Sequence, residues 1–161
     1  MSTEFVVILA VVALLLLLSR FLVPGLPPKG LAARLTAWDF SLAAAGLLGL
    51  ILHCASMFYQ PFVASIPGSA AVISQINSMG TASVIWYVVP ALLLLIGLRR
   101  QHFVVLTVLA AALAAVGVTM YNGTALSTHL NTVSAAGVVV AAIMFLLVVP
   151  PWQIKPEPLQ S

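Results

Sequence analysis

The sequence predicts an all-α integral membrane protein, a single domain built as a bundle of five transmembrane helices. Of the 161 residues, 63% are hydrophobic and only 6% are charged, whereas soluble globular domains carry about 25% charged residues. A membrane-spanning helix needs roughly 20 mostly apolar residues, so this length has room for about five spans and for no soluble catalytic domain. Pro- and Gly-containing segments, together with the polar turn at residues 99–102, divide the chain into five apolar stretches.

The boundaries of the five stretches follow from these breaks. The first ends at Pro24 and the last at Pro150, because proline cannot continue a helix. No small-x-small cleavage site precedes Arg20, so the first stretch is expected to be retained rather than removed as a signal peptide. The spans are expected at about residues 5–23, 38–59, 81–98, 103–121 and 132–149.

The second span begins with a capping pattern. Thr36 stands three residues before Asp39, which is typical of a helix N-terminus. Asp39 is expected to cap this helix or to pair with Arg34, since a negative charge is favoured at a helix N-terminus. Its expected role is therefore structural.

A short amphipathic helix is expected between the second and third spans, at about residues 69–79. Val72, Ile73, Ile76 and Met79 recur at helical spacing, while serines and Gln75 occupy the other faces. This pattern favours a helix that lies at the membrane surface.

The distribution of Lys and Arg predicts the orientation. These residues occur after the first, third and fifth spans and are missing from the two alternate loops. Positive loops face the cytoplasm, so the N-terminus is expected outside and the C-terminus inside. The composition, rich in Ala, Val and Leu with few Lys, suggests a bacterial source, and hence a multi-pass protein of the inner (plasma) membrane.

Small residues spaced by four predict where helices pack closely, because they let two backbones approach. Such pairs occur in the second, fourth and fifth spans, which are expected to form the interior of the bundle. The pairs are Ala45 with Gly49, Ala110 with Ala114, and Gly137 with Ala141.

His53 is the one titratable side chain placed clearly inside a span. An imidazole there is either hydrogen-bonded to a neighbouring helix, the commoner situation, or a haem ligand, a metal ligand or a quinone partner. His129, in the loop expected before the fifth span, is the candidate second ligand for a cofactor at His53. Met57, Met79 and Met120, with the lone cysteine Cys54, raise the alternative of Cu(I), but methionine is a common gap filler and core packing is the stronger interpretation. No metal ligand and no resident cofactor are assigned.

No catalytic motif is present, and every carboxylate and lysine lies in a loop or at a span end, which disfavours an enzyme and a proton-coupled pump. The net charge of +3 does not indicate a nucleic-acid partner. The expected function is that of a small accessory or structural subunit of a larger membrane complex, respiratory or transport-related, with the lipid bilayer and larger membrane subunits as partners. The alternatives are a small oligomeric transporter or channel, and a membrane redox or quinone-site protein that uses His53.

Overall fold

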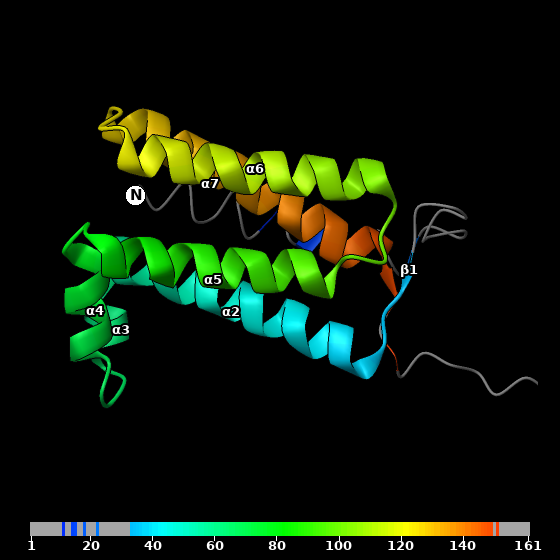
Figure 1. Ribbon diagram of the computed structural model, residues 1–161, viewed down its shortest axis with the longest axis horizontal. Coiled ribbons are helices and arrows are strands. Elements are labelled where there is room, and N and C mark those ends of the chain that lie inside the picture. The colour runs from blue at the N-terminus through cyan, green and yellow to red at the C-terminus, as the bar shows by residue number, and fades with distance from the viewer. Residues whose placement is uncertain are drawn as a thin grey trace, which may run out of the picture.

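The computed structural model describes residues 33–149, together with Val11, Leu14, Leu15, Leu18, Leu22 and Pro151. The described part is mostly helical, and its helices run back and forth in two stacked pairs (Figure 1). α2 (Ala37–Phe58) packs along α5 (Thr81–Gly97), and α6 (Phe103–Tyr121) packs along α7 (Leu126–Ala142). The chain at Ile143–Leu147 continues α7 as a π-helix.

Three of these helices are long and apolar enough to cross a membrane: α2, α6 and the continuous helix Leu126–Leu147. A fourth span results if α4 (Ala70–Asn77) and α5 are counted together, although the two are bent by 103° at the break between them. The described helices are therefore those of a membrane-embedded protein. The first expected span, 5–23, lies almost entirely outside the described residues.

The two ends of the bundle differ. At one end, β1 (Ala33–Arg34) and β2 (Val148–Val149) form a two-residue parallel pair, which holds the chain before α2 against the chain after the π-helix. We call this the strand end. At the other end, the α4 end, α3 (Gln60–Ala64) and α4 fold across the tips of α2 and α5 (Figure 1). α4 lies within the 69–79 stretch for which an amphipathic helix was expected.

Two glycines set the spacing between α2 and α5. A Cβ added at Gly46 would lie 2.4 Å from the backbone nitrogen of Leu94, and one at Gly97 would lie 2.4 Å from the backbone nitrogen of Ala43. The backbones therefore touch directly at both places, a contact that only glycine permits. Gly49 likewise makes room for the ring of Pro90 on α5, because a Cβ added at Gly49 would lie 2.7 Å from that ring.

Most of the small residues that were expected to mark close helix packing do not lie at the close contacts. Among them, Gly49 is in close contact with α5, whereas Ala45, Ala114 and Gly137 are exposed and Ala110 and Ala141 are half-buried. No described atom comes within 4 Å of a Cβ added at Gly137. The helices instead approach each other most closely at Gly46 and at Gly97. Gly46 is next to the expected residue Ala45, and Gly97 lies on α5, for which no pair was expected.

Candidate functional site

The buried polar side chains gather in two clusters, one at each end of the bundle. Along α2, Asp39 and His53 are separated by about 21 Å at the rise of an α-helix. The strand-end cluster contains Asp39 and Gln101, and the α4-end residues are His53, Ser56, Ser69, Ser83 and His129.

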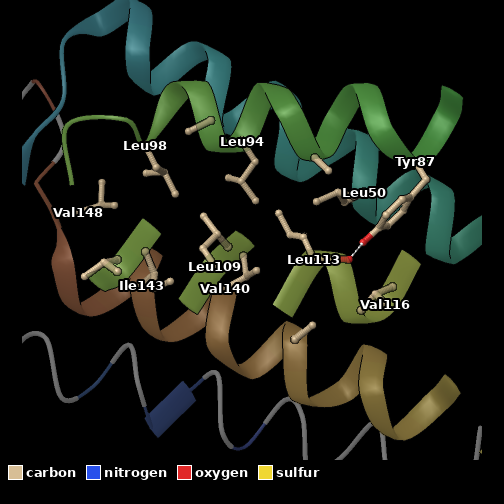
Figure 2. Packing of buried hydrophobic residues seen from close by; sticks show 14 of the residues in the cluster. Leu50, Tyr87, Leu94, Leu98, Leu109, Leu113, Val116, Val140, Ile143 and Val148 are labelled. Atoms are coloured by element: carbon tan, nitrogen blue, oxygen red, sulfur yellow. Dashed lines mark hydrogen bonds between the residues drawn. The ribbon is translucent and has the colours of Figure 1, made fainter. Parts of the chain in front are cut away.

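An apolar layer lies between the two clusters. We define it by seven side chains from α2, α5 with its C-cap, α6, and α7 with its π-helical continuation, which Figure 2 shows interlocked at the centre of the bundle. The buried polar group of the described residues that reaches this layer is the Tyr87 hydroxyl, and it is bonded to the Leu113 carbonyl oxygen at 2.6 Å. The described interior therefore offers no continuous polar path from end to end. The seven residues are Leu50, Leu94, Leu98, Leu109, Leu113, Val140 and Ile143.

The strand-end cluster is built around Asp39, whose side chain is fully buried at the start of α2. The backbone N–H of Asp39 donates to Thr36 Oγ1 at 3.1 Å, and the Thr36 hydroxyl donates to Asp39 Oδ2 at 2.8 Å. This confirms the expected helix cap. The alternative prediction, that Asp39 pairs with Arg34, is wrong, because the carboxylate pairs with Arg99 at 2.9 Å and with Arg100 at 2.7 Å.

The reason for this correction is the antiparallel packing of α2 and α5. Gly97 seats the end of α5 against the first turn of α2, so the turn that follows α5 places Arg99 and Arg100 over Asp39. One carboxylate between two guanidinium groups leaves a positive cluster at the strand end. These ion pairs hold the turn after α5 against the start of α2, so the role of the cluster is structural.

The α4-end cluster is built around His53, whose side chain is 1% exposed. Its Nε2 lies 3.3 Å from the thioether sulfur of Met120 on α6. Its ring meets the ring of Tyr87 on α5 edge to face, with 5.5 Å between the ring centres. The Tyr87 hydroxyl donates in turn to the carbonyl oxygen of Leu113 at 2.6 Å (Figure 2).

His129 belongs to the same end of the bundle, but not to a loop. α7 begins at Leu126, six residues before the expected fifth span, because the polar stretch before Thr132 is helical and the N–H of His129 donates to the Ala125 carbonyl. The His129 side chain is therefore buried, and its Nδ1 lies 3.0 Å from Thr119 Oγ1.

His53 and His129 are thus both buried at the α4 end, on α2 and α7. The Phe58 ring, on α2, lies 6.0 Å from that of His129. Sequence reasoning did not find Thr119 or Tyr87, because a hydroxyl in an apolar helix has no spacing signature.

Of the four sulfur-bearing residues considered with His53, Met120 is the one that lies against the imidazole. Cys54 and Met57 are half-buried on α2, and Met79 is exposed at the bend between α4 and α5. Among the described residues, no group of three or more His, Cys, Asp or Glu side chains gathers closely enough to hold a metal ion.

Comparison with known proteins yields no matching family model, no matching curated protein and no matching solved structure.

Proposed function

We propose that this chain is a small accessory subunit of a larger multi-subunit membrane complex, a respiratory or envelope transport assembly, and that it acts by helix packing. The observation that carries the proposal is the apolar layer between the two polar clusters. A conduit needs polar groups or water along its length, and the layer separates the two ends by leucine, valine and isoleucine side chains. This packing disfavours a conduit through the single chain and favours a static role.

A contact surface for the partner is proposed on the first apolar segment. Its five described residues are helical, and each is exposed, by 41–73%. They are spaced along one face of a helix and include no small residue for close packing within the chain. The five are Val11, Leu14, Leu15, Leu18 and Leu22.

The proposed orientation has the N-terminus outside, the C-terminus cytoplasmic and five spans in the inner membrane of a bacterium. The positive cluster of Arg99 and Arg100 then lies at the cytoplasmic surface, where lysine and arginine are enriched. The α4 end lies outside, and the turn after α6 contains no charged residue.

Site-specific photo-crosslinking in native membranes tests the accessory role. A photoreactive residue at Leu15 is expected to give a stoichiometric adduct with a larger membrane protein, identified by mass spectrometry. The matched control is Leu48, which is exposed on α2 by 65% and is expected to give lipid adducts alone. The proposal fails if Leu15 also yields only lipid adducts, or if the purified chain alone moves a solute across liposomes.

A membrane redox or quinone-site protein remains the second candidate, because His53 is buried and its Nδ1 has no hydrogen-bond partner among the described residues. A buried imidazole nitrogen without a partner is costly, so a ligand at His53 would have a physical reason to bind. The visible absorption spectrum of the purified chain tests this candidate, which predicts a haem or flavin band or an extractable quinone.

A further inference from the structure

The charged side chains of the described range all lie at one end of the bundle. Residues 33–149 contain four of them: Arg34, Asp39, Arg99 and Arg100. Arg34 is on β1, and Asp39 is at the start of α2, where it pairs with the other two arginines. The strand end therefore carries three positive charges against one negative charge within this range, and the α4 end carries none.

Asp39 holds two of these guanidinium groups in place. Its carboxylate is fully buried and accepts a hydrogen bond from the Thr36 hydroxyl, which fixes its position. Arg99 reaches it through Nη2 at 2.9 Å and Arg100 through Nε at 2.7 Å. An arginine loses rotamer freedom when it binds a ligand, and here the ion pairs have already ordered both side chains.

Each guanidinium group still has donors to offer. A guanidinium carries five N–H groups in one plane, and the contact with Asp39 uses one nitrogen of each. The other two nitrogens of Arg99 and of Arg100 have no hydrogen-bond or ion-pair partner among the described residues. Both side chains are 52% exposed, so an anion can approach them from outside the bundle.

The next residue of the turn is a buried amide with unused hydrogen-bonding capacity. Gln101 is 5% exposed, and neither the nitrogen nor the oxygen of its side chain has a hydrogen-bond partner among the described residues. A buried polar group without a partner costs free energy. A polar ligand at this turn therefore has a second physical reason to bind, beside the charge.

Exposed aromatic side chains indicate the depth of the turn in the membrane. Trp38, next to Asp39 on the first turn of α2, is 68% exposed, and Phe103, the first residue of α6, is 76% exposed. Both helices are long and apolar enough to cross a membrane, and both begin at the strand end. Tryptophan at the end of a spanning helix sits at the level of the lipid headgroups, so the two guanidinium groups are expected at that level too.

We propose that Arg99 and Arg100 form a binding site for the phosphate of an acidic phospholipid. A phosphodiester supplies a negative charge and oxygen acceptors, which match the excess positive charge and the free N–H donors. A zwitterionic lipid fits less well, because it brings a positive charge of its own. The exposed apolar surface of α6, which begins at Phe103 and Val104, offers contact for acyl chains and so favours a lipid over a free anion.

Native mass spectrometry of the full chain in a neutral detergent tests the proposal. The chain is titrated with phosphatidylglycerol and, separately, with phosphatidylcholine that has the same acyl chains. We expect one phosphatidylglycerol per chain to bind about tenfold more tightly than phosphatidylcholine, the effect of one hydrogen bond between charged groups. Arg99→Lys and Arg100→Lys keep the charge, but an ammonium group lacks the separate edges that hold Asp39 and a phosphate together. Each should therefore lower the affinity for phosphatidylglycerol about tenfold.

The matched control is Arg34→Lys, which makes the same exchange at an exposed arginine of the same end that does not pair with Asp39. This variant should bind phosphatidylglycerol as the parent does, and circular dichroism verifies that every variant is folded. Inorganic phosphate is added in a further titration and should not displace the lipid. The proposal is overturned if the two lipids bind equally, if Arg99→Lys and Arg100→Lys bind phosphatidylglycerol as the parent does, if Arg34→Lys loses as much as they do, or if inorganic phosphate displaces the lipid.

Discussion

The backbone contacts at Gly46 and Gly97 give the sharpest stability prediction. Each glycine lies where α2 and α5 touch, and each added Cβ would meet backbone atoms: Leu94 N and Pro90 O at 2.4 and 2.6 Å for Gly46, and Ala43 N and Asp39 O at the same distances for Gly97. Backbone atoms within two helices cannot rotate away as a flexible side chain can. An alanine at either position therefore has to push the helices apart.

The magnitude follows from the distances. Ordinary contact requires about 3.5 Å or more between heavy atoms, so the helices must separate by about 1 Å at the substituted position. Overpacking of this kind costs about 1–3 kcal/mol, against a gain of about 0.5–1 kcal/mol from replacing glycine by alanine inside a helix. Gly46→Ala and Gly97→Ala should each lower the free energy of unfolding by about 1–2 kcal/mol on balance. The double variant should lose less than the two single losses combined, because the first substitution already opens part of the same interface.

Thermal or SDS-induced unfolding in detergent measures these losses, with Cys54 as the single thiol that a fluorogenic maleimide detects on unfolding. Gly137→Ala is the matched control: it adds the same methyl group to α7, where no described atom lies within 4 Å. This variant should unfold as the parent does, or slightly later. The reasoning is refuted if Gly46→Ala and Gly97→Ala are as stable as the parent, or if Gly137→Ala loses as much as they do.

Three further predictions concern the clusters and the orientation. Asp39→Asn should lower the midpoint of thermal unfolding more than Arg99→Gln, because the carboxylate pairs with two guanidinium groups and each guanidinium with one carboxylate; equal losses would contradict this. Tyr87→Phe removes the hydrogen bond from α5 to an α6 carbonyl and should cost about 1 kcal/mol in free energy of unfolding, and an unchanged unfolding curve would show that the bond contributes nothing. In a cysteine-free background, a membrane-impermeant maleimide should label Asn122→Cys from outside intact cells and His102→Cys only after permeabilisation. The opposite pattern would reverse the proposed orientation.

Features that depend on neighbours in the sequence were predictable. The Thr36 cap needs only Thr36 and Asp39, three residues apart, and the structure has it. The apolar stretches were equally visible in the composition, and three to four described helices are long and apolar enough to cross a membrane. In each case the determining interaction is local or depends only on the average character of a segment.

Features that depend on how the helices are rotated were not predictable. A soluble helix shows its buried face by its polar opposite face, but a membrane helix is apolar all round and leaves its rotation undefined. Spacing by four identified Ala45 and Gly49, yet the closest approach is at Gly46. The pairing of Asp39 with Arg99 and Arg100, and of His53 with Met120 across 67 residues, likewise follows from the packing of α2 on its neighbours.

The contact between α2 and α5 connects the two polar clusters physically. Pro90 lies within α5 between the two ends, and its ring and carbonyl oxygen pack against Gly49 and Gly46. These contacts fix the axial position of α5 relative to α2. They therefore hold Tyr87, which lies one turn before Pro90, against His53. The same contacts bring the turn after α5 over Asp39 at the other end.

A shift of α5 along α2 would therefore disturb both clusters together. If Gly46→Ala moves the helices apart, the packing of Tyr87 at one end and the ion pairs of Asp39 at the other should be disturbed in the same variant, although Gly46 touches neither side chain. Gly97→Ala lies beside Asp39 and far from His53, so it should lower stability with a smaller effect on Tyr87. Thermal unfolding of each glycine variant with and without Tyr87→Phe separates these effects: the added loss from Tyr87→Phe should be smaller in Gly46→Ala than in Gly97→Ala. An equal added loss in both would show that the α4 end is held independently of α5.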